Sequence, residues 1–330
     1  MALAADELTR SPAWLPLEMQ GAAVRMVNLD EAAYRAASFL DQRLLAHGYA
    51  QEACAPALLE AAAARLTARA HYIFHTGHVG STLISRLIGA HAHFFSLREP
   101  ALLRALAAPT AASAAPSLAV TLALLGRTWR PSQHAVVKVT SFVSELAQTI
   151  LASSGQSSAV FMFAQPLAYL QGIFAGPNSR LEGRQLSVAR LLRLQRRLGT
   201  GASLAQPRSE GEGIAMSWLC EMTALREAAE HFASQVLWVD FEAFLRDPVA
   251  GLRTIFDRLG ARPADQELEA LVNGPLMRQY SKAPEHAYDA ALRRELLQCA
   301  DREHAAEIRR GLDWLYAAAR GHALAAAVVQ

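Results

Sequence analysis

The sequence predicts an α/β fold in three layers, with a mostly parallel central sheet and helices on both of its faces. Five short apolar runs have the composition of buried strands, at residues 71–76, 93–97, 134–139, 158–163 and 236–240. Segments of helical periodicity separate them, and this alternation is typical of parallel sheets covered on both faces. Hydrophobic residues make up 52% of the 330 residues, which suffices for a large core.

Composition excludes several classes of protein. The apolar fraction excludes a mainly disordered chain, and a formal net charge of +2 gives no electrostatic footprint for nucleic acid. No stretch reaches the ~18 uninterrupted apolar residues of a membrane-spanning helix, and the N-terminus lacks the features of a signal peptide. Three dispersed cysteines (Cys54, Cys220, Cys299) suit free thiols in a reducing compartment. We therefore expect a cytoplasmic protein with neither a membrane nor a nucleic acid as its partner.

Three units are expected along the chain. Residues 1–68 form an N-terminal, mainly helical extension, with one strand-like run at 22–29 followed by helices over 30–46 and 51–68. The α/β core spans 69–262, and 263–330 form a helical segment that packs on it. Within the last two units, helices are expected at 81–88, from 100 onward, and at 118–127, 142–151, 185–198, 214–233, 248–259 and 264–324, the last interrupted by a loop at 275–284. Segments 108–117, 172–184 and 199–213 are expected to be loops, the last two of them mobile.

The turn Gly77-His-Val-Gly-Ser-Thr82, between a predicted strand and a predicted helix, is the strongest local signal. Its glycines allow backbone N–H groups to face an anion, and the helix that begins at Ser81 adds the positive end of its dipole. His78 would add a cation and Thr82 a hydroxyl. A Walker A motif is excluded because Gly-Lys-Ser/Thr is missing. The alternative is an ordinary strand-to-helix turn capped by Ser81.

Two ionisable residues follow neighbouring predicted strands. Glu99 comes after residues 93–97, and Lys138 ends the strand within 134–139. Ligands bind at the carboxyl ends of parallel strands, so both side chains are expected near the glycine turn. Glu99 suits a general base, or alternatively a carboxylate that favours a helix start. Lys138 is one of only two lysines, the other being Lys282, and its alternative role is that of an ordinary exposed side chain.

The segment 77–84 resembles the phosphosulfate-binding loop of sulfotransferases. In that family the loop holds the 5′-phosphosulfate of 3′-phosphoadenosine 5′-phosphosulfate (PAPS). The resemblance implies a P-loop-like fold and assigns the donor to six consecutive residues: Gly77, His78, Val79, Gly80, Ser81 and Thr82. Two of them depart from the family pattern, because His78 stands where Lys or Arg is usual and Val79 where Ser is usual.

Other segments extend the resemblance over residues 70–260. Residues 87–99 are similar to the segment in which some members place a glutamate base, which implies that Glu99 deprotonates the acceptor. Lys138 resembles the lysine that ends the corresponding strand, which implies that it stabilises charge on the bridging oxygen. The resemblance thus implies three catalytic residues, Glu99, Lys138 and His78, the last of which holds the phosphosulfate. Residues 236–260 resemble the family's closing strand, Asp-Pro and helix, and we interpret them as architectural.

The resemblance fails at the family's 3′-phosphate site. Ala164-Gln165-Pro166 replaces the expected Arg-Asp-Pro, and the expected serine falls near Gly172. Substitutes would come from Arg180 and Arg184, or from the basic C-terminal loop. That loop contains the remaining expected donor-binding residues, Arg278, Ser281 and Lys282.

These observations predict a sulfotransferase that moves a sulfuryl group from PAPS, its co-substrate, to a hydroxyl of a small molecule or carbohydrate. The alternative is a P-loop-like protein that binds a nucleotide or phosphate without this activity. A third reading, an ATP-dependent phosphotransferase, is weaker because the Walker lysine is missing. No metal site is predicted, because His71, His75 and His78 do not share one helical face and His91 and His93 have no cysteine or carboxylate partner beside them. The acceptor stays open, and a homo-oligomer is allowed but not indicated.

Overall fold

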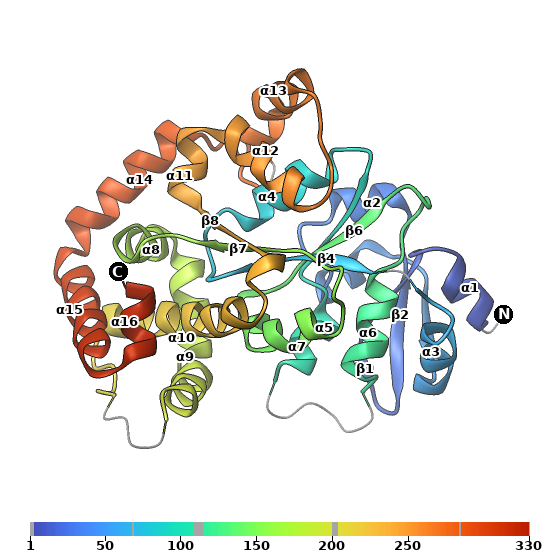
Figure 1. Cartoon of the computed structure of the whole chain (residues 1–330), viewed down its shortest axis with the longest axis horizontal. Coiled ribbons are helices and arrows are strands. Elements are labelled where there is room, and N and C mark those ends of the chain that lie inside the picture. The colour runs from blue at the N-terminus through green and yellow to red at the C-terminus, as the bar shows by residue number, and fades with distance from the viewer. Residues whose placement is uncertain (1–2, 68, 109–114, 200–203, 284, 330) are drawn as a thin grey trace.

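A five-stranded parallel sheet forms the centre of the molecule (Figure 1). The computed structural model describes residues 3–67, 69–108, 115–199, 204–283 and 285–329. The strand order is β5-β6-β4-β7-β8. The strands are β4 (Ala70–His75), β5 (Phe94–Arg98), β6 (His134–Lys138), β7 (Ala159–Phe163) and β8 (Val236–Asp240). The predicted parallel sheet is confirmed, and each of the five apolar runs overlaps one of its strands.

Each face of this sheet has its own hydrophobic core, because alternate strand residues point to opposite sides. Ile73 and Val160 pack in one core with α4 (Ser81–Gly89) and α12 (Pro248–Arg258). Tyr72 and Phe161 belong to the other core, together with residues of α5 (Ala101–Leu106), η2 (Ser141–Leu146) and α7 (Ala147–Ala152). The three-layer α/β prediction is therefore confirmed.

The N-terminal segment contains a small antiparallel sheet in the order β1-β2-β3. Its elements are α1 (Ala5–Arg10), β1 (Trp14–Gln20), β2 (Ala23–Asn28), α2 (Glu31–Ala36), η1 (Gln42–His47), β3 (Gln51–Cys54) and α3 (Pro56–Ala63). The expectation of a mainly helical extension misses this sheet. The helix predicted over 51–68 is wrong at its start. Residues 51–54 pair with β2 instead, and the helix begins at Pro56. Proline disfavours strands, and Pro16 lies in an edge strand beside an irregularity in its pairing.

The loop expected at 172–184 is mostly helical. It contains the end of α8 (Pro166–Phe174) and the beginning of α9 (Pro177–Leu198). Both prolines occupy the first helical position, where the missing N–H costs nothing, so here proline starts helices rather than breaking them. Likewise α10 (Glu210–His231) begins four residues earlier than predicted, because Ser209 and Glu212 form a capping box. Parts of the other two predicted loops, 109–114 and 200–203, lie outside the described residues.

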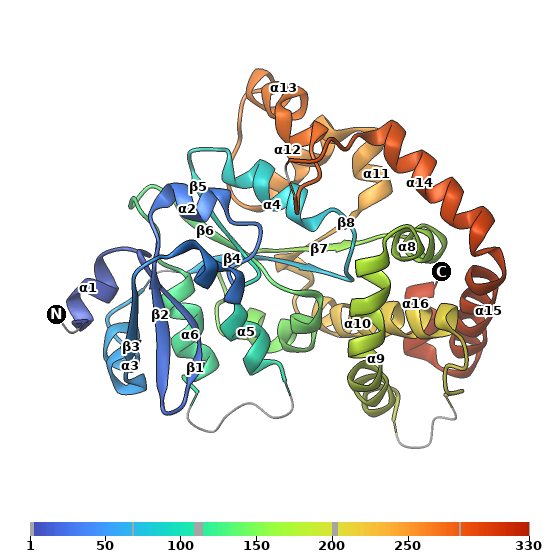
Figure 2. The same ribbon diagram turned by 180° about the vertical axis from the view of Figure 1, so that it is seen from behind.

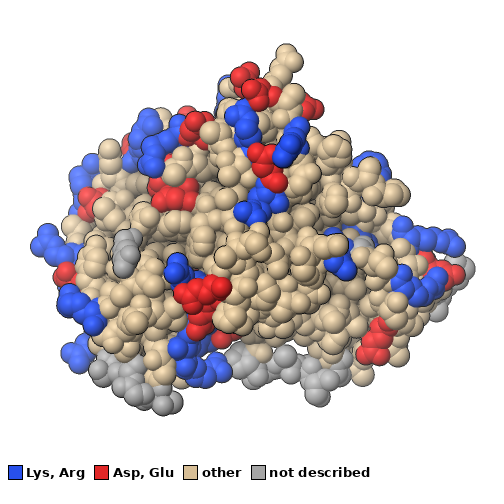
Figure 3. All heavy atoms as spheres, viewed as in Figure 1, with Lys and Arg blue, Asp and Glu red and all other residues tan. Residues whose placement is uncertain are grey.

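The C-terminal part is helical, as predicted, and α14 to α16 pass along one end of the molecule (Figure 2). The remaining elements are α6 (Leu118–Leu125), η3 (Ala233–Gln235), α11 (Phe241–Arg246), α13 (Asp265–Asn273), η4 (Pro275–Arg278), α14 (Ala290–Glu303), α15 (Ala305–Gly321) and α16 (Ala323–Val329). Within the described ranges, no helix combines the length and the apolar character needed to cross a membrane. On the face drawn in Figure 3, basic and acidic side chains are interspersed.

Candidate functional site

The loop that follows β4 has an unusual backbone. Gly77 has φ +100°, His78 φ +54° and Gly80 φ +66°. Among the described residues, His78 and Glu99 are the only non-glycine residues with a positive φ. Such conformations are costly for L-residues and concentrate at functional sites. Two of the three predicted catalytic residues therefore have strained backbones.

His75 fixes the backbone at the start of this loop through two hydrogen bonds of its ring. Its Nδ1 accepts a hydrogen bond from the Gly77 N–H at 3.0 Å, so the ring proton is on Nε2, which lies 2.9 Å from the carbonyl oxygen of Val139. Burial holds the pKa of His75 well below its usual value. The neutral ring thus ties the end of β4 to the end of β6, and it occupies the N–H that Gly77 would otherwise offer to an anion.

Gly80 permits a close approach between the loop and α11. A Cβ atom at this position would lie 2.0 Å from the ring of Phe241. Phe241 is the first residue of α11, directly after β8. The two ends of the predicted resemblance, the glycine loop and the closing strand, therefore meet at this contact.

Thr82 lies in the first turn of α4 and is 3% exposed. Its Oγ1 is buried and has no hydrogen-bond partner among the described residues. A buried hydroxyl without a partner costs free energy, and the first turn of a helix attracts negative charge. Together these features place an unsatisfied donor and the positive end of a helix dipole at one point, an arrangement that could bind an anion.

A cavity of about 580 Å³ opens beside this helix start. Its walls come from the loop, the junction of α8 and α9, α11, α12, α14 and the segment that follows η4. Seven of the nine predicted donor-binding residues line it: His78, Val79, Gly80, Ser81, Thr82, Ser281 and Lys282. The other two, Gly77 and Arg278, are not among the lining residues.

The segment around Lys282 is attached to α4 by Arg86, whose Nε donates to the carbonyl oxygen of Ser281 at 2.9 Å. The Nζ of Lys282 lies 5.9 Å from the ring centre of Phe39. Burial is the main cause of the lowered pKa values of His75 and His78, and the positive charge of Lys282 lowers both pKa values further. Lys282 therefore supplies positive charge to the side of the cavity formed by the loop.

His78 points toward α9. Its Nδ1 lies 2.9 Å from the Oγ of Ser179, and its Nε2 lies 3.3 Å from a carboxylate oxygen of Glu182. Sequence reasoning did not single out either partner, because both fall in the segment expected to be a loop. Both ring nitrogens are engaged by α9 in this structure.

Glu99 and Lys138 contact each other. The ammonium of Lys138 is hydrogen bonded to the carboxylate of Glu99, and the Glu99 N–H donates to the carbonyl oxygen of Lys138 at 2.6 Å. Lys138 is fully buried, which lowers its pKa, while the charge of Glu99 acts in the opposite direction. The parallel pairing of β5 with β6 brings these two residues together. Neither of them is among the residues that line the cavity.

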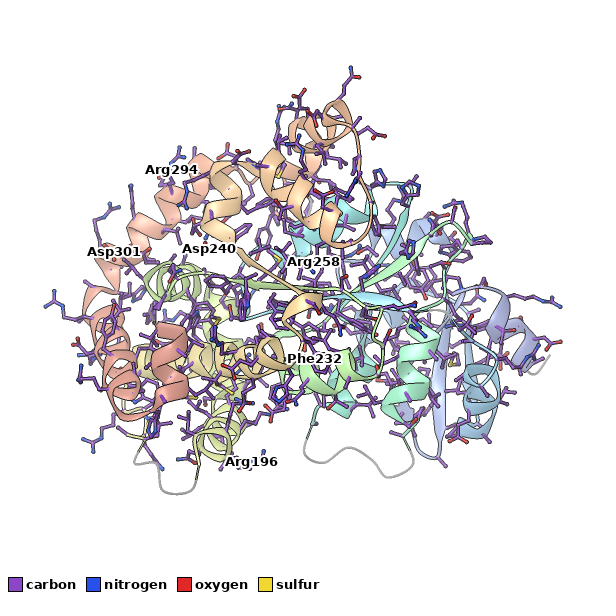
Figure 4. All side chains as sticks on the ribbon, viewed as in Figure 1. Arg196, Phe232, Asp240, Arg258, Arg294 and Asp301 are labelled. Carbon is purple, nitrogen blue, oxygen red and sulfur yellow. The ribbon has the colours of Figure 1, made fainter. Side chains whose placement is uncertain are left out.

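The expected 3′-phosphate position contains no cation from β7. Gln165 follows this strand, and its Nε2 lies 3.4 Å from a carboxylate oxygen of Asp240. Asp240, labelled in Figure 4, lies at the end of β8. The suggested substitutes Arg180 and Arg184 both form ion pairs with Glu210, at 2.5 and 3.3 Å, and neither lines the cavity.

Arg293 of α14 lines the cavity and was missed by sequence reasoning. Its guanidinium carbon lies 5.1 Å from the ring centre of Phe241, and it forms an ion pair with Glu242. Its Nε is buried without a partner among the described residues. Nothing in the sequence distinguishes this arginine from the other 29, because only the fold brings α14 to the cavity.

In the part of the chain that the structure describes, no group of three His, Cys, Asp or Glu side chains is arranged to hold a metal ion.

Comparison with known proteins identified similar structures. They are sulfotransferases. The sulfotransferase domain from the curacin biosynthetic pathway is 14% identical, with a TM-score of 0.42 over 76% of this chain and 98% of that domain. The domain from the Synechococcus PCC 7002 olefin synthase is 17% identical, with a TM-score of 0.40 over 71% and 94%. Mouse sulfotransferase SULT7A1 complexed with PAP is 13% identical, with a TM-score of 0.42 over 79% and 88%.

No family model matches the chain, and no curated protein matches its sequence. Structural similarity at these identities and scores assigns neither a donor nor an acceptor to this chain.

Proposed function

We propose that this chain is a sulfotransferase that takes a sulfuryl group from PAPS and transfers it to a hydroxyl of a small molecule or carbohydrate. One observation carries the donor site. The buried, unpartnered hydroxyl of Thr82 lies in the first turn of α4, beside a cavity that Lys282 also lines. An oxyanion of the donor would satisfy this hydroxyl and interact favourably with the helix dipole.

The residues around the cavity suit a nucleotide that carries anionic groups at two positions. Ser81 and Thr82 would hold the phosphosulfate, and Lys282 would add positive charge to the same site. Arg293 would bind a second anionic group, since its unpartnered Nε lies in another wall of the cavity. A volume of about 580 Å³ falls within the range typical of small-molecule sites.

Glu99, which follows β5 and lies outside the cavity lining, would act as the base for an acceptor hydroxyl placed between it and the donor. The acceptor oxygen attacks sulfur, the bond from sulfur to the bridging oxygen breaks, and the acceptor proton passes to the carboxylate. Positioned bases of this kind typically contribute 10²–10⁴-fold to a rate. Lys138 is bonded to Glu99 and fully buried, so we assign it the role of orienting this carboxylate. To stabilise the bridging oxygen instead, it would have to leave Glu99.

A second function is favoured by the environment of Gln165. The Asp240 carboxylate beside it would repel a phosphate at this position. A protein that binds a nucleotide with a single phosphorylated end, without sulfuryl transfer, fits this feature.

Calorimetric titration with 3′-phosphoadenosine 5′-phosphate (PAP), and with ADP for comparison, tests the donor site. We expect micromolar affinity for PAP, which corresponds to ~8 kcal/mol, and weaker binding of ADP. Thr82→Val removes the hydroxyl and should weaken PAP binding about tenfold, the effect of one hydrogen bond to a charged group. Thr121→Val is the matched control, because Thr121 in α6 is also buried with an unpartnered hydroxyl. Equal affinities for PAP and ADP would favour the second function.

Transfer of labelled sulfate from PAPS to a panel of phenols, alcohols and sugars tests the reaction itself. Glu99→Gln should lower the turnover of any acceptor at least 100-fold while leaving the affinity for PAP unchanged. Transfer at the wild-type rate by this variant would exclude Glu99 as the base.

A further inference from the structure

The first turns of α9 contact the glycine loop through the imidazole of His78. Ser179 and Glu182 are three residues apart, so they project from the same side of the helix, and each binds one ring nitrogen, at 2.9 and 3.3 Å respectively. The His78 side chain is only 17% exposed. It also lines the same cavity as Thr82. His78 therefore lies between the proposed anion site and a carboxylate.

A neutral ring satisfies both of these contacts. Nε2–H donates to Glu182, and Nδ1 accepts from the Ser179 hydroxyl. Burial lowers the pKa of His78, and the charges of Lys282 and Arg190 lower it further, whereas the hydrogen bond to Glu182 raises it. The neighbouring His75 is held neutral by its two backbone contacts. Without a ligand, burial and these neighbouring cations thus favour the neutral form of His78.

The same geometry also accommodates a protonated ring. A hydroxyl both donates and accepts, so Ser179 can rotate its hydrogen away and accept from Nδ1–H without any change of backbone. The hydrogen bond from His78 lowers the pKa of Glu182 to about 2, so this carboxylate is negative throughout the neutral range. Glu182 is therefore available to compensate a charged imidazolium.

We propose that Ser179 and Glu182 are positioning residues that allow His78 to take up one proton when an anion enters the cavity, so that anion and proton bind together. This inference rests on the proposed function only in that the anion binds at the loop. An incoming negative charge favours the imidazolium, and Glu182 is the partner that makes this charge tolerable in a buried position. His78 would then supply, only when the ligand binds, the positive charge that a Lys or Arg at this position would carry permanently.

Inorganic sulfate is the suitable probe, because it does not change its own charge over the neutral range, unlike a phosphate. Calorimetry in two buffers of different ionisation enthalpy measures the protons taken up for each sulfate bound. We expect uptake approaching one proton at pH values between the pKa of His78 in the unliganded protein and its higher pKa in the complex. Over that window the Kd for sulfate should rise up to about tenfold for each pH unit, since one proton is linked to one anion.

Three variants separate positioning from simple structural support. Glu182→Gln should abolish proton uptake at neutral pH and weaken sulfate binding about tenfold. His78→Lys carries a fixed charge, so it should bind sulfate without proton uptake. Glu60→Gln, an exposed carboxylate on α3, is the matched control and should retain the wild-type uptake and Kd.

Each outcome decides the matter. Sulfate binding that is independent of pH and takes up no proton would overturn this inference and leave the proposed function standing. Wild-type proton uptake in Glu182→Gln would show that Glu182 is not the positioning residue. If the wild-type protein binds neither sulfate nor PAP at any pH, both the inference and the proposed function are overturned.

Discussion

At the scale of single residues, the loop after β4 depends on backbone conformations that most side chains disfavour. Gly80 combines a positive φ with a position against the ring of Phe241. His78 adopts a positive φ as well, although it has a side chain, and the contacts of its ring with α9 help to hold it there. The loop is thus kept in shape by neighbouring elements rather than by its own local preferences.

Replacement of Gly80 by alanine should destabilise the protein by about 2–5 kcal/mol. The left-handed backbone contributes about 1–2 kcal/mol of this cost, and the collision with Phe241 contributes about 1–3 kcal/mol. Urea denaturation measures the change. Gly48→Ala is the matched control, because Gly48 has a φ of +70° but open space around it, so only the backbone cost should appear. Equal losses in the two variants would mean that Phe241 moves aside freely.

At the scale of elements, buried arginines of α9 connect this helix to the rest of the core. The Nε of Arg190 lies 2.6 Å from a carboxylate oxygen of Glu221 in α10, and its Nη2 donates to Ser141 at 2.9 Å. Ser141 lies in η2, and its Oγ would be 3.6 Å from a Cβ atom placed on Gly77. The carboxylate of Glu221 also accepts a hydrogen bond from Ser144. A buried network of this kind fixes the position of α9 relative to the loop.

Removal of one partner of this ion pair should cost about 3–5 kcal/mol of unfolding free energy, because the other charge is left buried and unpaired. We expect this loss for Arg190→Met and for Glu221→Leu in urea denaturation. The double variant should be more stable than the sum of the two single losses predicts, since no charge is left alone. Additive losses, or single losses below about 1 kcal/mol, would argue against a buried pair.

At the scale of the whole molecule, Arg86 on α4 joins segments from both ends of the chain to the core. Its guanidinium donates to the Ser38 hydroxyl at 2.8 Å and to the carbonyl oxygen of Ala36 at 3.2 Å. Its Nε donates to Ser281 at 2.9 Å. The N-terminal extension and the segment that carries Lys282 are therefore attached to the helix that begins at the anion site.

Arg86→Met should loosen both of these segments together. Each hydrogen bond to a charged group is worth about 1.5–3 kcal/mol, so amide hydrogen exchange should become at least tenfold faster around residues 36–38 and around Ser281. Mass spectrometry of peptides from the exchanged protein measures this. Arg65→Met, which removes an exposed ion pair with Asp6, is the control and should change neither segment. Faster exchange in one segment alone would mean that Arg86 does not couple them.

Much of the candidate site could be predicted from the sequence because its parts are local. The turn from Gly77 to Thr82 combines two glycines, two hydroxyls and the start of a helix within six residues. Glu99 follows β5 and Lys138 ends β6, and the carboxyl ends of parallel strands meet at one edge of a sheet. The two residues do meet, although neither of them lines the cavity. Arg293, Ser179 and Glu182 were missed, because helices from distant or misassigned segments carry the first two to the cavity and Glu182 to His78.

The sequence by itself determined the central parallel sheet and the glycine loop after β4, because short-range periodicity and turn chemistry specify both. Only the tertiary structure decided that Lys138 pairs with Glu99 and that α9 contacts His78. The same holds for Arg86, which attaches the segments around Ser38 and Ser281 to α4. Pairings between residues far apart in the chain depend on how the elements pack. Many arginines in this sequence have similar local surroundings, so no local signal indicates which partner each will find.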